Sequence, residues 1–158
     1  LFFSASVSAE SEERSEVEQQ LFCLAEAIYF ESRGETFVGM VGVGQVIFQR
    51  MESSSYPNDI CSVVHQGEYH PNGVPVRNKC EFSYWCDGKL EKVDNSFALN
   101  ESYSAAELVL SGGKVEGLEK ALHYHASYVR PPWSRKLKRL KIIGLHIFYS
   151  KERIKEND

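Results

Sequence analysis

The 158-residue chain lacks long hydrophobic runs and compositional extremes. No segment reaches the roughly 18 consecutive apolar residues that a membrane-spanning helix requires. Hydrophobic residues make up 42% and charged residues 25%, as in ordinary globular proteins. There is no internal repeat, and only the acidic start is of low complexity. The sequence therefore predicts one folded domain without a membrane span.

The chain also lacks an excess of positive charge. Its net charge of −4 weighs against nucleic acid as a partner, because binding to phosphates normally demands a basic surface. Lysines and arginines nevertheless gather near the end of the chain, at Arg130, Arg135, Lys136, Lys138, Arg139 and Lys141. This basic cluster is either a solvated surface or a means of attracting an anionic polymer or surface.

The first residues, LFFSASVSAE, lack the basic start of a complete signal peptide. Their apolar beginning and the small residues at Val7-Ser8-Ala9 are typical of the end of one, with cleavage after Ala9. We expect residues 1–17 to be a signal-peptide remnant and a disordered acidic leader, residues 18–152 the folded domain, and residues 153–158 a tail. This leader predicts an exported protein, periplasmic or extracellular.

Cysteine is scarce but even in number. Four cysteines suit an exported protein with two disulfide bonds, for which we favour Cys23–Cys61 and Cys80–Cys86 because the second pair flanks a short FSYW segment. Four free buried thiols are the alternative. A metal site is less favoured because the spacing does not form a Cys-x-x-Cys knuckle.

Apolar periodicity predicts helices first and strands later. Helices are expected over residues 17–33, ended by Gly34, and over 38–51, 60–64 and 96–110. Residues 67–79 predict a loop or irregular hairpin, and residues 121–126 and 141–149 predict strands. Three glycines in the second helix, Gly39, Gly42 and Gly44, suggest close backbone approach, most simply by the first helix. The pattern predicts an α+β domain with a small antiparallel sheet.

Glu31 stands where the apolar face of the first helix should continue. On a helical wheel it lies beside Leu24, whereas Glu26 falls on the opposite side. Apolar neighbours would desolvate the Glu31 carboxyl and raise its pKa, as a general acid working near neutral pH requires. The alternative is an exposed glutamate at a frayed helix end. Glu35 is a possible second catalytic carboxylate, a partner for Arg33 or a capping residue, and Arg33 is a candidate for a salt bridge or a sugar contact.

Several motifs occur in a fixed order between Leu21 and Tyr149. They are CLAEAIYFESRGE, YPNDICSVV, CEFSYWCDG, HYHA followed by VRPPW, and IGLHIFY. In this order they resemble the SleB-type cell-wall hydrolase family of spore-cortex-lytic enzymes. The resemblance implies a lysozyme-like, peptidoglycan-cleaving catalytic domain over residues 18–152, without a metal or other cofactor, in which Glu31 is the catalytic acid. Ser32 replaces the alanine that is more usual in the family.

Aromatic and histidine residues are the remaining site candidates. A strand over Phe82–Trp85 would separate Ser83 and Trp85 from Phe82 and Tyr84, and sugar rings stack on such aromatic faces. His146 is expected to be a hydrogen-bonded core residue. The predicted substrate-binding set is Arg33, Ser83, Tyr84, Trp85, Tyr124, His125 and Trp133.

Zinc chemistry is an alternative to glycan cleavage. His123 and His125 would share one face of a strand, a spacing that also serves zinc sites in cell-wall peptidases. His65, His70 or His146 could complete such a site, but the His-Glu-x-x-His helix of many zinc peptidases is missing.

The predicted activity is cleavage of the β-1,4 bond between N-acetylmuramic acid and N-acetylglucosamine in peptidoglycan strands. Glu31 would act as general acid, either in a lytic transglycosylase or in a hydrolase that needs a second carboxylate. Glu35, Glu81 and Asp87 are candidates for that second group. A non-catalytic peptidoglycan-binding module is the further alternative.

Overall fold

The computed structural model describes the backbone of residues 4–89 and 92–154, with side chains from Ser15 onward. Helices come first: α1 (Ser4–Glu31), α2 (Phe37–Glu52) and α3 (Ile60–Val64). A small hairpin of β1 (Gly67–Tyr69) and β2 (Pro75–Cys80), the 3-10 helix η1 (Ser83–Trp85) and helix α4 (Ser96–Leu110) follow. A second sheet ends the fold, with β3 (Ala121–Ala126), the 3-10 helix η2 (Pro132–Arg135), β4 (Leu137–Ile143) and β5 (His146–Arg153). The predicted α+β class is confirmed.

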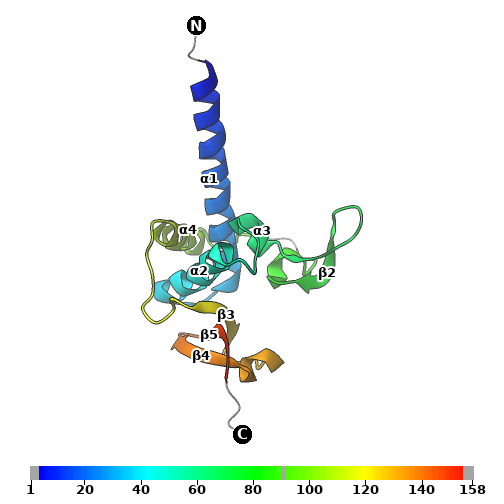
Figure 1. The fold of residues 1–158 in the computed structure, drawn as a ribbon, viewed down its shortest axis with the longest axis vertical. Helices are drawn as coiled ribbons and strands as arrows, with labels where there is room; N and C mark the ends of the chain where they lie inside the picture. The colour runs from blue at the N-terminus through cyan, green and yellow to red at the C-terminus, as the bar shows by residue number, and fades with distance from the viewer. Residues whose placement is uncertain (1–3, 90–91, 155–158) are drawn as a thin grey trace.

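Helix α1 is longer than predicted. It begins at Ser4, so residues 4–17 are helical where the sequence predicted a disordered acidic leader, and residues 1–3 lie outside the described residues. No glycine or proline interrupts residues 4–33, and alanine and glutamate favour helix throughout this segment. In Figure 1 the first half of α1 projects away from the rest of the molecule as a single rod. None of the described helices, α1 included, is apolar enough over its length to cross a membrane.

Helix α2 lies between the other helices and the larger sheet (Figure 1). A Cβ atom added at Gly44 would lie 2.8 Å from Cδ1 of Ile28 on α1, so this glycine admits the predicted close approach of α1. At Gly42 the same atom would lie 3.1 Å from Phe148 of β5, and at Gly39 it would meet the Glu35 carboxylate. Only one of the three glycines therefore serves the α1 crossing.

The larger sheet is antiparallel, with the strand order β3-β5-β4. The segment 141–149 is two strands rather than the predicted single one, because the chain turns at Gly144, whose φ angle is +54°. Ile143 pairs with His146 directly across this turn. The turn places β5 in the centre of the sheet, where Phe148 is fully buried against the helices.

Both predicted disulfide bonds are present. Cys23–Cys61 joins α1 to α3, and Cys80–Cys86 closes the segment that contains η1. Within this loop the FSYW segment forms a 3-10 turn instead of the expected strand, since the disulfide and the bond from Asn78 N–H to the Cys86 carbonyl bring its ends together. Its side chains still alternate, because Phe82 and Tyr84 are buried and Ser83 is exposed.

Candidate active site

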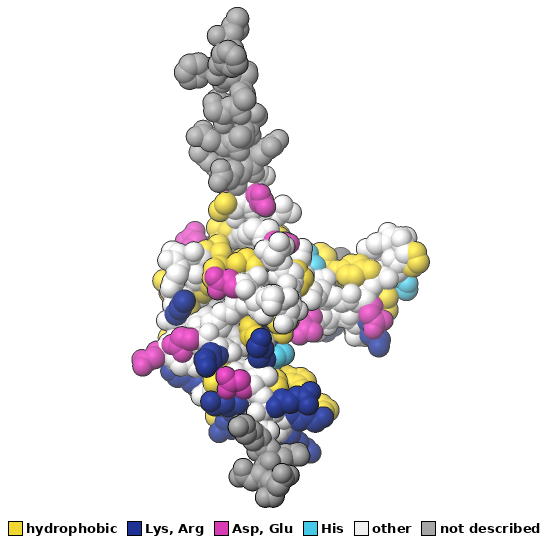
Figure 2. All heavy atoms as spheres, in the orientation of Figure 1, with side chains coloured by type: hydrophobic (Ala, Val, Ile, Leu, Met, Phe, Trp, Pro, Cys, Tyr) yellow, Lys and Arg dark blue, Asp and Glu magenta, His cyan; other side chains and the backbone are white. Residues whose placement is uncertain are grey.

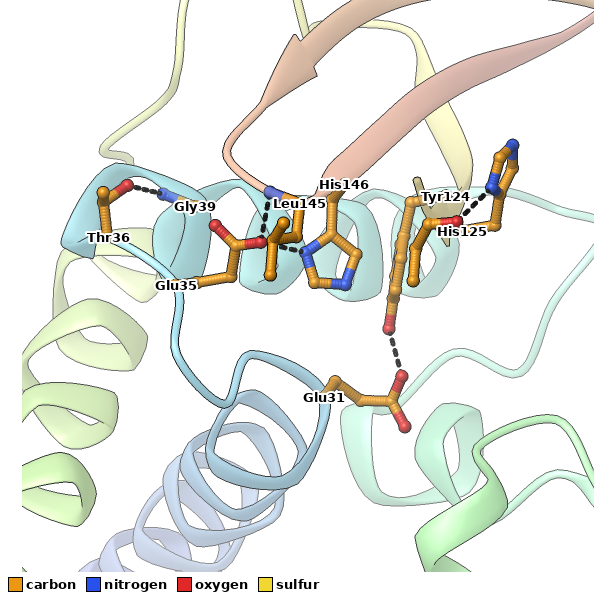
Figure 3. Close-up of polar contacts among 9 residues, drawn as sticks. Glu31, Glu35, Thr36, Gly39, Tyr124, His125, Leu145 and His146 are labelled. Atoms are coloured by element: carbon orange, nitrogen blue, oxygen red, sulfur yellow. Dashed lines mark hydrogen bonds and ion pairs between the residues drawn. The ribbon is translucent and has the colours of Figure 1, made fainter. Parts of the chain in front are cut away.

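Glu31 is the last residue of α1, and Gly34 ends the helix beyond it with a φ angle of +77°. Its Oε2 atom accepts a hydrogen bond of 2.9 Å from the Tyr124 hydroxyl on β3 (Figure 3). Burial raises the pKa of the Glu31 carboxyl above its usual value. The Tyr124 hydrogen bond and the charge of Arg50 favour the carboxylate and oppose this rise, but burial is the larger influence. The pKa shift therefore has the direction expected of a general acid.

Tyr124 is suited to donate to Glu31 at every physiological pH. Burial, together with the neighbouring Glu31 carboxylate, holds the pKa of the Tyr124 phenol well above its ordinary value. The phenol therefore keeps its proton and stabilises the charged form of Glu31 by a directed hydrogen bond.

Two hollows meet at Glu31. The first has a volume of about 380 Å³ and is lined by Phe30, Glu31, Arg33, Ser83, Tyr84, Asp87, Lys89, Lys92 and Asp94. The second has a volume of about 360 Å³ and is lined by Glu31, Arg50, Glu81, Phe82, His123, Tyr124, His125, Val129, Pro131 and Trp133. Each is large enough for a small ligand, so Glu31 stands where an extended substrate could occupy both.

Six of the seven predicted substrate-binding residues line these hollows. Arg33, Ser83 and Tyr84 belong to the first hollow, and Tyr124, His125 and Trp133 belong to the second. Trp85 lies in neither of them. Its ring stacks on His65 with the centroids 3.5 Å apart, and its indole N–H donates to the Tyr69 hydroxyl, so the structure places it in the base of the β1–β2 hairpin.

Arg33 forms the salt bridge that the sequence suggested, and it also lines the first hollow, where a sugar contact stays a prediction. Its guanidinium lies over the rings of Tyr29 and Phe30, 5.2 and 5.5 Å from their centroids, and 4.0 Å from the Asp94 carboxylate. More than half of the side chain is exposed, so this ion pair is weak and leaves the guanidinium accessible from the first hollow.

Glu35 holds the fold together away from the hollows. Its Oε1 atom accepts hydrogen bonds from the Leu145 N–H, at 2.7 Å, and from His146 Nδ1, at 2.9 Å (Figure 3). The side chain is 1% exposed and lines neither hollow. The hypothesis that Glu35 is a second catalytic carboxylate is therefore not supported. Its proposed capping role belongs to Thr36, whose side chain accepts from the Gly39 N–H.

Arg50 is a site residue that the sequence analysis missed. Its side chain is buried, donates from Nε to the Leu122 carbonyl at 2.8 Å, and forms a 3.1 Å ion pair with Glu81. The guanidinium also lies over the rings of Tyr56 and Phe82. An arginine among the apolar positions at the end of a helix was the available signal, but it is also common there because it interacts favourably with the helix dipole.

The two histidines of β3 form a wall of the second hollow. Both rings contact the Trp133 ring, with centroids 5.5 and 5.6 Å away for His123 and His125. The ring nitrogens of His125 lie 2.8 Å from the Ala126 carbonyl and 3.0 Å from the Tyr149 hydroxyl. Among the described side chains, no group of three or more His, Cys, Asp or Glu is placed to hold a metal ion. The geometry thus offers no third ligand for the zinc alternative.

Known proteins are similar to this chain in sequence. Residues 34–149 match the family model described as Cell Wall Hydrolase. The spore cortex-lytic enzyme of Bacillus subtilis is 30% identical over 127 residues, which are 79% of this chain and 35% of that enzyme. The corresponding Bacillus cereus enzyme is 30% identical over 126 residues, 79% of this chain and 42% of that enzyme. The chain therefore spans less than half the length of these curated relatives.

Solved structures agree with the sequence matches. The catalytic domain of the germination-specific lytic transglycosylase SleB from Bacillus anthracis superposes with a TM-score of 0.61 and 28% identity, covering 83% of this chain and 93% of that one. For the catalytic domain of the Bacillus cereus SleB protein these values are 0.58, 27%, 84% and 91%. The lysozyme-like fold and the SleB-type resemblance are thus confirmed. The chain belongs to the cell wall hydrolase family.

Proposed function

We propose that the protein cleaves peptidoglycan strands at the β-1,4 bond between N-acetylmuramic acid and N-acetylglucosamine, with Glu31 as general acid. The observation that carries this proposal is a half-buried carboxyl group with a raised pKa at the junction of two hollows. A sugar chain that occupies both hollows would place one glycosidic oxygen beside Glu31. Membership of the cell wall hydrolase family supports a glycan of the wall as the polymer, and the two disulfides suit a site of action outside the cytoplasm.

In the first step, protonated Glu31 donates its proton to the glycosidic oxygen, and the bond from this oxygen to C1 of the muramyl sugar breaks. In a lytic transglycosylase the Glu31 carboxylate then removes the proton from the C6 hydroxyl of the same sugar. The C6 oxygen bonds to C1, giving a 1,6-anhydro end without consuming water. Glu31 thereby regains its proton for the next cycle.

We favour the lytic route because of the contacts that the other candidate carboxylates make. A hydrolase needs a second carboxylate about 5 to 9.5 Å from the acid. Glu35 is committed to the β4–β5 turn, and Glu81 is paired with Arg50. Asp87 lines the first hollow but carries no contact with Glu31 that assigns it a role. The Bacillus anthracis domain of the same fold is named a lytic transglycosylase, which favours the same chemistry here.

The test is a digest of purified peptidoglycan by the wild type and by Glu31→Gln, with the products weighed by mass spectrometry. The substitution keeps the size of the side chain but removes the proton donor, so we expect cleavage to fall by about two to four orders of magnitude. Glu107→Gln makes the same change on the exposed face of α4 and should cleave normally.

Products lighter than hydrated muropeptides by one water would support the lytic route. Hydrated reducing ends would support a hydrolase, with Asp87 or Glu81 as the candidate second carboxylate. If neither protein releases products but both bind the polymer equally, the binding-module alternative replaces the proposal.

A further inference from the structure

The larger sheet and its connections carry a strong positive charge in an acidic protein. Residues 120–153 contain nine lysines or arginines and a single acidic residue, Glu152, whereas the rest of the chain contains nine basic and twenty-one acidic residues. The basic members are Lys120, Arg130, Arg135, Lys136, Lys138, Arg139, Lys141, Lys151 and Arg153. Figure 2 shows Lys and Arg side chains gathered over the part of the molecule where Figure 1 places β4 and β5. We call residues 120–153 the basic lobe.

Ion pairing within the described residues leaves most of this charge uncompensated. Glu152 is shared by Lys120, at 3.5 Å, and Lys138, at 3.6 Å, and Lys141 donates to the Glu116 carbonyl. The other basic side chains of the lobe form no ion pair with a described residue, and Lys136 and Arg139 are exposed. The lobe therefore presents a field that extends into solvent.

Protection of a sheet edge does not explain this arrangement. Lysines on an edge strand deter pairing with another chain, which would account for the cations of β4. Beyond Ser150, β5 pairs with β4 alone, so Lys151 and Arg153 also lie at an edge. Arg130 and Arg135, however, lie outside the strands. Selection against edge pairing would not place cations at Arg130 and Arg135.

Arg130 links the basic lobe to the candidate active site. Its neighbours in sequence, Val129 and Pro131, both line the second hollow beside Glu31. The basic lobe thus reaches the rim of the second hollow near Arg130 and continues along the β4–β5 hairpin. An anionic chain bound there would lie next to the glycan that the proposed activity cleaves.

We infer that the basic lobe binds a linear anionic polymer of the cell wall whose charges are phosphodiesters. Such a polymer carries one permanent negative charge in each repeat and no cations, which complements nine basic residues and one acidic residue. A membrane surface fits less well. The exposed apolar residues Ile142 and Leu145 lie at the turn between β4 and β5, whereas Lys136 and Arg153 lie at the opposite end of these strands.

Binding of the full-length protein to purified poly(glycerol phosphate), measured over a series of salt concentrations, tests this inference. The variant Lys136→Gln/Arg139→Gln removes two cations without a described ion pair. We expect this variant to bind more weakly. The slope of log Kd against log salt concentration should fall by roughly 1.4, because each lost cation removes about 0.7 from it. The matched control Arg77→Gln/Lys79→Gln removes one arginine and one lysine from the exposed β2 strand and should bind as the wild type does.

Cleavage of peptidoglycan stripped of other polymers separates this inference from the proposed function. The Lys136→Gln/Arg139→Gln variant should cleave it at the wild-type rate, because neither residue lines a hollow beside Glu31. Equal affinity of both double variants for the polymer would overturn the inference. So would tighter binding of the wild type to phosphatidylglycerol vesicles than to the polymer, which would assign the basic lobe to a membrane surface.

Discussion

At the scale of single residues, the Tyr124–Glu31 hydrogen bond sets the pH range of the proposed acid. Burial raises the pKa of Glu31 and the Tyr124 hydroxyl opposes that rise. Tyr124→Phe removes the hydrogen bond to the carboxylate, so the pKa of Glu31 should rise further. Because cleavage requires protonated Glu31, the high-pH limb of the rate profile should move to higher pH, as measured by digestion of peptidoglycan across a pH series.

Tyr128→Phe is the matched control for this experiment. Tyr128 is 81% exposed and lines neither hollow, so the loss of its hydroxyl should leave the profile unchanged. A high-pH limb that stays in place or moves to lower pH in Tyr124→Phe would contradict the assignment of Glu31 as the acid.

Ser32 places a hydroxyl group in the interior of the fold, where it stabilises no described contact. Its side chain is 1% exposed, and its Oγ atom has no hydrogen-bond partner among the described residues. Ser32→Ala should therefore raise the free energy of unfolding by about 1 kcal/mol, since a buried hydroxyl without a partner is costly. Urea denaturation would measure the change. Ser111→Ala, which removes an exposed hydroxyl bonded to the Leu108 carbonyl, should give no such gain.

At the scale of elements, patterns within short segments were readable from the sequence. The apolar period located α2 and α4 to within one or two residues, and Gly34 marked the end of the first helix. The position of Glu31 on the border of the apolar stripe predicted its partial burial for the same reason. Each of these inferences uses only residues within a few turns of one another.

Apart from the Cys23–Cys61 disulfide and the approach of α1 at Gly44, features that depend on distant residues were not readable. The β-rich composition of residues 141–149 does not reveal that the chain reverses at Gly144, which becomes evident only when Glu35 is seen packed against this turn. The same holds for Arg50, whose partner Glu81 lies 31 residues further along the chain. Local periodicity carries no information about such pairs, so a catalytic role was predicted as possible for Glu35 and none was predicted for Arg50.

At the scale of the whole molecule, Glu35 and His146 join the helical part to the larger sheet. Glu35 lies in the α1–α2 connection, directly after the helix that carries Glu31, and His146 begins β5. Tyr124, the partner of Glu31, belongs to the same sheet. The Glu35–His146 contact therefore helps to fix the distance between the two residues that define the proposed acid.

This contact should make stability depend on pH. Burial lowers the pKa of His146 below its ordinary value of 6.5 and outweighs the opposing charge of Glu35. As the pH falls below 6.5, the unfolded chain takes up a proton that the folded protein does not, so stability is lost down to the lower pKa of the folded state. His65 and His123, whose pKa values burial also lowers, add to the same trend.

Comparison of wild type and His146→Gln isolates the contribution of His146 to the pH dependence of stability. Urea denaturation at a series of pH values should show a smaller loss of stability between pH 6.5 and lower pH in the variant, because one titrating group is gone. His70→Gln, in the exposed β1–β2 loop, is the matched control and should follow the wild type. An unchanged pH dependence in His146→Gln would mean that His146 is protonated equally in both states. The contact between the helices and the sheet would then be a charged pair rather than a hydrogen bond from a neutral histidine.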